Sequence, residues 1–117
     1  MTDPEKDPQH AWMSQCTQIP GVLGCGIHRA DGSILFQSMD EGLPGDQLEN
    51  LLRRMAAWEP LLIDALKGFK SAIWRFEKAS IRCDWRTDGT MACVVVRQEG
   101  EATSRLDERM SAFMTLA

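Results

Sequence analysis

The sequence lacks several features that mark well-known classes of protein. No apolar run approaches the roughly 20 residues that span a bilayer. The N-terminal stretch MTDPEKDPQHAW is acidic and has no apolar signal core, so we expect a cytoplasmic protein. The sequence has fewer basic than acidic residues: 13 Lys and Arg compared with 17 Asp and Glu, which gives a formal net charge of -4. This balance argues against broad binding to nucleic acid or to an anionic membrane.

Motifs for metal, redox and nucleotide chemistry are missing as well. Cys16, Cys25, Cys83 and Cys93 are widely spaced and form no C-x-x-C pair, so the sequence predicts neither a zinc knuckle nor a redox pair. We interpret all four as reduced, mostly buried side chains. There is no G-x-x-x-x-G-K-[ST] loop, so no cofactor is expected and any nucleotide should belong to a partner.

The composition is that of an ordinary globular protein. With 117 residues, 44% of them hydrophobic and 26% charged, the chain is long enough for one domain with one core. We expect residues 1–7 to form a flexible N-terminal tail and residues 8–117 to form a single domain. Asp7 followed by Pro8 predicts the start of a short helix, which Pro20-Gly21 ends.

A β-hairpin is predicted over residues 22–29 and 33–38. The two segments flank Asp31-Gly32, the pair that favours a type I′ turn. In the register that this turn implies, Ile27 lies opposite Phe36. One face of the hairpin would then carry Leu23, Cys25, Ile27, Ile34 and Phe36, and the other would carry Gly24 and Gly26, which would let a helix approach closely.

A long central helix is predicted to begin at Asp46. Its apolar stripe consists of Leu48, Leu51, Leu52, Met55 and Leu62, and its polar residues lie off this stripe. Pro60 lies inside the pattern, where it removes a hydrogen bond and clashes with the preceding turn. The helix must therefore kink at Pro60, or stop and restart there.

Three further strands and a last helix follow. Residues 71–77 and 80–86 alternate cleanly between apolar and polar, with a turn expected at Lys78-Ala79 and Trp74 opposite Cys83. Residues 91–97 contain an ACVVV run, which predicts a central strand covered on both faces. The predicted fold class is α/β in the broad sense. More specifically, it is an α+β fold with a profilin-like layout. We expect a five-stranded, mainly antiparallel sheet with helices on both faces, in the order α-β-β-α-β-β-β-α.

No catalytic constellation stands out among the reactive side chains. Cys25 and His28 are three positions apart, and in a strand such positions point to opposite faces. Asp31 and Asp88 precede turn glycines, where aspartate serves the backbone. An enzyme that uses Cys93 or His28 would need a base beside the thiol, and no residue points to one. We therefore expect the protein not to be an enzyme.

The sequence resembles the roadblock (dynein light-chain type) domain family. The resemblance is carried by IPGVLGCGIHRADGSILFQSMD, a hairpin entered through Pro-Gly and closed on Asp-Gly, then by the long helix, and then by SAIWRFEKASIRCDWRTDGTMACVVVRQ, a three-strand meander. Pro60 departs from the uninterrupted central helix that is typical of the family.

This resemblance implies a homodimer in which the central helices pack together and the sheets join edge to edge. It further implies a non-catalytic, protein-binding adaptor or scaffold, or a regulator, for a small Ras-like GTPase or a motor complex. Trp58, a large aromatic at the helix edge, is a candidate interface anchor, and the alternative is that it packs in the core under the kink at Pro60. The expected dimer interface consists of Leu51, Met55, Trp58, Ile73 and Arg75, and the expected partner-binding residues are Glu49, Arg53 and Arg54.

An alternative hypothesis is a small-molecule sensor. The layout of helices around an antiparallel sheet is also similar to PAS-like and GAF-like folds, which hold a ligand between sheet and helix. Such a domain needs a sizeable pocket lined with a few polar groups. The large Trp and Phe side chains on the alternating strands indicate a filled core instead.

Overall fold

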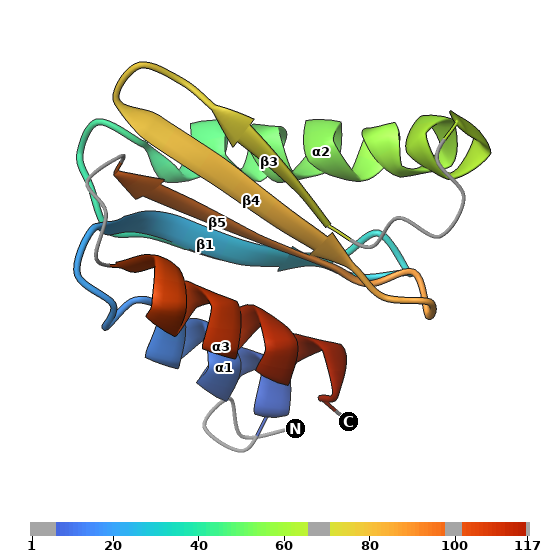
Figure 1. Cartoon of the computed structure of the whole chain (residues 1–117), viewed down its shortest axis with the longest axis horizontal. Helices are drawn as coiled ribbons and strands as arrows, with labels where there is room; N and C mark the ends of the chain where they lie inside the picture. The colour runs from blue at the N-terminus through green and yellow to red at the C-terminus, as the bar shows by residue number, and fades with distance from the viewer. Residues whose placement is uncertain (1–6, 66–70, 98–101, 117) are drawn as a thin grey trace.

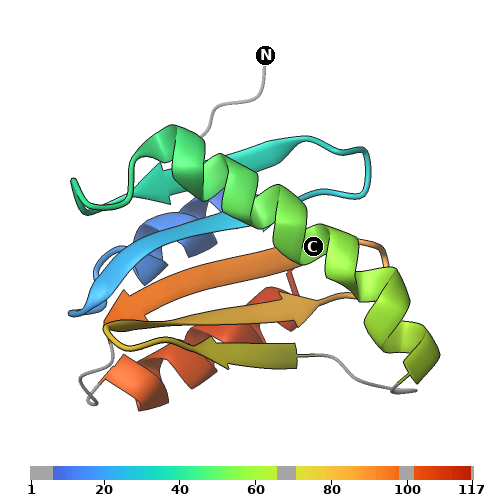
Figure 2. The same ribbon diagram turned by 90° about the horizontal axis from the view of Figure 1, so that it is seen from above.

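The chain forms one antiparallel sheet with helices on both faces (Figures 1 and 2). The structure is a computed structural model that describes residues 7–65, 71–97 and 102–116. The helices are α1 (Pro8–Cys16), α2 (Gly45–Ala65) and α3 (Ala102–Met114). The five strands lie in the order β2-β1-β5-β4-β3 and span Val22–His28 (β1), Ile34–Ser38 (β2), Ser71–Arg75 (β3), Ala79–Trp85 (β4) and Met91–Arg97 (β5). The predicted fold class and element order are confirmed.

The core lies in two layers, one on each side of the sheet. Figure 1 shows α1 and α3 on one face and α2 on the other. Strand β5 occupies the centre, and its first five residues are buried, as the ACVVV run predicted. The α1/α3 layer is built on Trp12, Cys25, Ile27, Val94, Met110 and Phe113, and the α2 layer on Leu48, Leu52, Ile81, Cys83, Trp85 and Cys93.

In the first hairpin, the register between β1 and β2 differs by one residue from the predicted register. Ile27 lies opposite Leu35, whereas the prediction placed it opposite Phe36. Because side chains alternate along a strand, this shift moves Ile34 and Phe36 to the α2 face and brings Leu35 against the α1/α3 layer. Leu23 also packs in the α2 layer, since a register shift near the start of β1 interrupts the alternation.

The predicted type I′ turn is wrong for a simple conformational reason. Such a turn needs positive φ at two successive residues, but only Gly32 has one, at 90°. The loop therefore holds one more residue, and the backbone N–H of Arg29 donates to the carbonyl of Ser33 at 2.9 Å. The hairpin between β4 and β5 repeats this solution, with Gly89 also at 90°.

These two loops share the pattern Arg-x-Asp-Gly-Ser/Thr, at residues 29–33 and 86–90. In each, the aspartate carboxylate accepts a hydrogen bond from the backbone N–H two residues later, at 2.9 Å in the first loop and 3.0 Å in the second. A Cβ placed on Gly89 would lie 3.1 Å from the Cβ of Ala30. The two loops thus lie side by side at one end of the sheet.

The hairpin between β3 and β4 closes earlier than predicted. The backbone N–H of Phe76 donates to the carbonyl of Ala79 at 2.8 Å, so the turn lies before Ala79. Trp74 consequently lies opposite Ile81, two positions from the expected Cys83. A shift of two residues leaves every side chain on its predicted face.

Helix α2 lies very close to β1 because glycines face it. A Cβ on Gly24 would lie 3.1 Å from a methyl carbon of Leu48, and one on Gly26 would lie 2.4 Å from a methyl carbon of Leu52. The predicted role of these glycines is confirmed. The helix also continues through Pro60 to Ala65 without a break, so it does not stop and restart (Figure 2).

Helices α1 and α3 are tied to each other through Trp12. Its indole N–H donates to the backbone carbonyl of Arg109, and its ring lies 5.2 Å from that of Phe113. No helix in the described parts of the chain is both long and apolar enough to pass through a membrane.

Arginines from the two Asp-Gly loops fasten the ends of these helices. Arg29 donates to Gln9 at 2.8 Å and to Asp7 at 3.0 Å, and Asp7 is the N-cap of α1. Arg86 lies over the ring of Phe113 at 5.5 Å and donates to its carbonyl at 3.4 Å, near the end of α3. Asp7 is therefore part of the domain, and residues 1–6 of the predicted tail lie outside the described residues.

Candidate protein-binding surface

The outer side of α2 carries large apolar side chains. Leu48 and Leu52 on the inner side are fully buried against the sheet. On the outer side, Trp58 keeps 47% of its surface exposed and Leu61 keeps 64%. The two are three residues apart, so they lie on neighbouring turns of one helix face. An exposed Trp-Leu pair of this kind is typical of a site that another protein covers.

The second part of the surface is the edge strand β3. It pairs with β4 on one side only, because it is the last strand of the sheet. Ala72 and Trp74 point into the α2 layer, and Ile73 points to the opposite face, where 52% of it is exposed. Phe76, just beyond the strand, is 53% exposed. An unpaired edge flanked by exposed apolar side chains is a site for pairing with another strand.

The structure divides the predicted dimer residues into two groups. Leu51 and Met55 are half-buried and pack against the α2 layer of the core, so their main contacts are within the chain. Trp58, Ile73 and Arg75 are exposed. Trp58 stands on the outside of α2, whereas Ile73 and Arg75 lie on the other face of the sheet edge. The five residues together do not form one continuous patch.

The predicted partner-binding residues do lie together on α2. Arg53 and Glu49 form an ion pair one turn apart, with 3.2 Å between Arg53 Nη2 and Glu49 Oε1. Arg54 is exposed beside them. An exposed pair of this kind contributes little to stability, about 0.3–0.5 kcal/mol, so these side chains remain available to a partner.

The surface predicted from the sequence leaves out two residues that the structure shows to be exposed, Leu61 and Phe76. Leu61 was overlooked because the apolar stripe was continued through Leu62, although its spacing of three from Trp58 was a readable signal. Phe76 was assigned to the strand interior, because the turn was placed one residue too late. Both errors hid exposed apolar side chains that the structure places near the C-terminal half of α2 or at the end of β3.

The cysteines are all reduced and buried, as predicted. Burial raises the pKa of the Cys16 thiol to about 12. A hydrogen bond with Cys93, together with burial, raises the pKa of the Cys83 thiol. Thiols with such high pKa values remain protonated at neutral pH and are poor nucleophiles. Cys25 lies in the α1/α3 core, and His28 lies on the other face of β1, as alternation requires.

The arginines of β4 are engaged in holding the fold. Arg82 donates to the carboxylate of Asp84 at 3.1 Å and also bonds to Asp107 of α3. Asp84 is only 6% exposed, and its burial raises the pKa of the carboxyl group while the hydrogen bond from Arg82 opposes that rise. Arg82 therefore connects the sheet to α3 and is not free to bind a partner.

Comparison with solved structures identifies the fold. No protein-family model matches the sequence, and no curated protein matches it. A Roadblock/LC7 domain from Streptomyces avermitilis superposes with a TM-score of 0.69 at 13% identity, over 93% of this chain and 92% of that one. The gliding protein MglB from Thermus thermophilus gives 0.71 at 15% identity, over 97% and 90%. The Myxococcus xanthus MglB gives 0.70 at 13% identity, over the same shares.

The chain has the Roadblock/LC7 fold. The resemblance that the two quoted segments indicated is thereby confirmed at the level of the fold. Sequence identities of 13–15% support a shared fold only. The assignment of residues to the candidate surface is therefore based on the geometry of this structure alone.

In this structure, α2 packs in direct contact with the sheet. The 2.4 Å that would separate a Cβ on Gly26 from Leu52 shows that even a methyl group does not fit between β1 and α2 there. A sensor of the PAS-like or GAF-like type holds its ligand in that space. The alternative hypothesis of a small-molecule sensor therefore receives no support.

Proposed function

We propose that this domain is a non-catalytic protein-binding module that acts as a homodimer. The observation that carries the proposal is the exposed apolar surface formed by Trp58 and Leu61 on α2, together with the open edge of β3. Covering such surfaces removes apolar area from water and satisfies the free edge of the sheet. A second copy of the chain can do both at once.

The dimer would form through two contacts. Strand β3 would pair with β3 of the second copy, which extends the sheet across the interface. Trp58 and Leu61 would pack between the two α2 helices, and Ile73 would be covered on the other face of the joined sheet. One solved structure with this fold is described as MglB with a tetrameric arrangement, and that description supports self-assembly as a property that the fold allows.

The partner of this dimer would be a small Ras-like GTPase or a component of a motor complex, for which it acts as an adaptor or regulator. This part rests on the resemblance to roadblock domains. Glu49, Arg53 and Arg54 would contact the partner, since Arg53 and Arg54 are exposed and the Glu49 side chain keeps 40% of its surface exposed. We propose a cytoplasmic location, as the sequence led us to expect. The net charge of -4 argues against a nucleic-acid or membrane partner, and we propose neither.

The non-catalytic part of the proposal rests on the state of the reactive groups. The thiols of Cys16 and Cys83 have raised pKa values and are buried. A hydrogen bond from the Ser33 hydroxyl lowers the pKa of Asp31, which is an ionised turn residue and a weak base. Neither kind of group is poised for proton transfer or nucleophilic attack near neutral pH.

Light scattering on a size-exclusion peak at micromolar concentration tests the dimer. A mass of twice the 13.1 kDa chain is expected. A monomer mass that persists at roughly 100 μM would refute the homodimer, because interfaces of standard size bind more tightly than that. Calorimetry with GTP, GDP and ATP should show no binding to this chain alone.

A further inference from the structure

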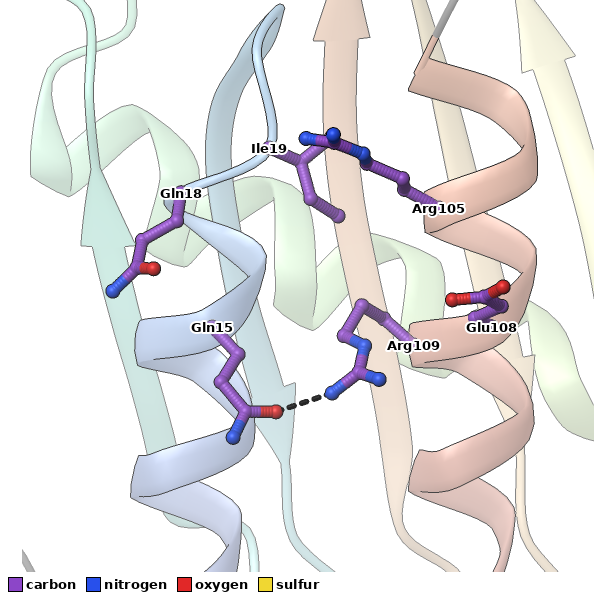
Figure 3. A pocket seen from close by; sticks show the side chains of 6 residues that line it. All are labelled: Gln15, Gln18, Ile19, Arg105, Glu108 and Arg109. Atoms are coloured by element: carbon purple, nitrogen blue, oxygen red, sulfur yellow. Dashed lines mark hydrogen bonds between the residues drawn. The ribbon is translucent and has the colours of Figure 1, made fainter.

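A groove lies between α1 and α3, on the face of the sheet opposite to α2. It has a volume of about 300 Å³ and is formed where the end of α1 meets the first turns of α3 (Figure 3). Its floor includes Ile19, which is 6% exposed. The residues that line it are Gln15, Gln18, Ile19, Arg105, Glu108 and Arg109.

Two arginines on α3 give the groove its chemistry. Arg105 and Arg109 are one helical turn apart, and Figure 3 shows both side chains extending from α3 toward α1. Arg109 donates to Oε1 of Gln15, an uncharged acceptor. Among the described residues no ion pair is found for Arg105. Two like charges at this spacing repel each other, and an anion between them removes the repulsion.

The remaining groups suit a peptide better than a bare inorganic anion. The hydrogen bond from Arg109 fixes the amide of Gln15 with its oxygen toward α3, which leaves its NH₂ donors for a peptide carbonyl. Ile19 offers an apolar floor for a side chain. A site for free phosphate would instead gather several backbone N–H groups around one point. The amides of the groove can therefore bind the backbone of a peptide, its apolar floor can contact a peptide side chain, and its guanidinium groups can bind a peptide carboxylate.

We propose that this groove binds an acidic peptide segment of a partner protein, with an Asp or Glu carboxylate held by Arg105 and Arg109. Glu108 stands on the same helix and repels carboxylates, so it limits where on the groove the acidic residue can lie. The groove is on the other face of the sheet from α2, and no residue of α2 or β3 lines it. The proposal is thus argued from other residues than the proposed homodimer.

The test uses peptides selected on the full-length chain. A library of random dodecapeptides is selected on the wild type, and each recovered peptide is then labelled and titrated by fluorescence anisotropy against variants. Arg105→Gln combined with Arg109→Gln removes both charges. Glu108→Gln removes the opposing charge. Thermal unfolding of every variant shows that the fold is retained, which is expected because none of the three residues belongs to the buried core.

Recovered peptides that bind the groove should be rich in Asp and Glu. Their affinity should fall about tenfold or more in the double arginine variant, as expected for lost charge-assisted hydrogen bonds, and should rise in Glu108→Gln. Replacing Glu by Gln within a recovered peptide should also lower its affinity for the wild-type protein. The proposal is overturned if no recovered peptide depends on Arg105 and Arg109, or if Arg54→Glu on the opposite face weakens the acidic peptides equally. Equal competition by inorganic phosphate, or by anionic phosphatidylserine vesicles, would also overturn it.

Discussion

Gly26 faces Leu52 across the contact between β1 and α2, and a Cβ on Gly26 would lie 2.4 Å from Leu52 Cδ1 and 2.7 Å from the carbonyl oxygen of Leu35. A flexible leucine methyl could move, but the backbone oxygen belongs to the paired strand β2 and cannot move without changing the hairpin. This position therefore requires glycine for steric reasons, although its φ is not in the left-handed region.

Gly26→Ala should lower the free energy of unfolding by about 1–3 kcal/mol, the usual effect of overpacking a filled core. Chemical denaturation monitored by tryptophan fluorescence measures it. Gly42→Ala is the matched control, because its nearest contact is an ordinary 3.4 Å to a carboxylate oxygen of Asp40. If the two variants are equally stable, β1 and α2 are not in the close contact described.

Trp58→Glu with Leu61→Glu should convert the proposed dimer into a folded monomer. Both side chains are largely exposed within one chain, so their replacement costs the monomer little, whereas two buried charges in a helix–helix interface cost several kcal/mol, on the order of an unpaired buried charge. Sedimentation equilibrium gives the mass, and circular dichroism shows whether the fold remains. Thr87→Glu, in an exposed loop, serves as the control. A double variant that is still a dimer would exclude α2 as the interface.

Reversal of Arg53 and Arg54 to Glu should weaken capture of the native partner and leave the dimer intact. Charges at the rim of an interface mainly tune encounter and specificity, and surface substitutions usually change stability by less than about 0.5 kcal/mol. The partner is first recovered by affinity pull-down, and its capture by each variant is then quantified. Arg75→Glu, at the edge strand, is the comparison. If that change abolishes capture while the helix reversals do not, the sheet edge binds the partner.

Arg82→Leu should destabilise the fold in a pH-dependent way. Its removal leaves the carboxylate of Asp84 buried without its partner, at a cost of about 3 kcal/mol near neutral pH. Burial already raises the pKa of Asp84, and the loss of Arg82 raises that pKa further. The folded state then binds a proton at a higher pH than the unfolded state does, so the deficit should shrink as pH falls through the folded pKa of Asp84.

Denaturant unfolding of wild type and variant from neutral pH down to about pH 4, near the ordinary pKa of aspartate, measures this deficit. Adding Asp84→Asn to Arg82→Leu should recover most of the lost stability at neutral pH, because no buried charge remains. A deficit that is the same at every pH would show that Arg82 acts through packing and not through its charge.

Much of the fold could be predicted from the sequence because local signals agreed with one another. The valine-rich run of β5 marked a strand buried on both faces, and Gly24 and Gly26 marked the close approach of a helix. The register of the first hairpin could not be predicted, because Asp31-Gly32 is compatible with two loop lengths. Only the conformation of Asp31, which has negative φ, decides between them.

The candidate surface was predictable in part. The place of Trp58 at the edge of the apolar stripe was compatible with an interface or with the core, and the structure shows that it is exposed. Whether Leu51 and Met55 face the sheet or a second subunit depends on how α2 is rotated about its axis. That rotation is set by the contact with Gly26, which is distant in sequence. The groove between α1 and α3 had no local signal, since it joins residues near Gln15 to residues near Arg105.

The sheet order also has a consequence for the speed of folding. Strands β1 and β5 are neighbours at the centre, yet β2, α2, β3 and β4 all lie between them in the chain. The hairpins β1–β2 and β4–β5 close short loops and can form early, whereas joining β1 to β5 closes a long one at a larger entropic cost. We expect this joining to limit the refolding rate, with α2 helping to hold the two hairpins together as the central pairing forms.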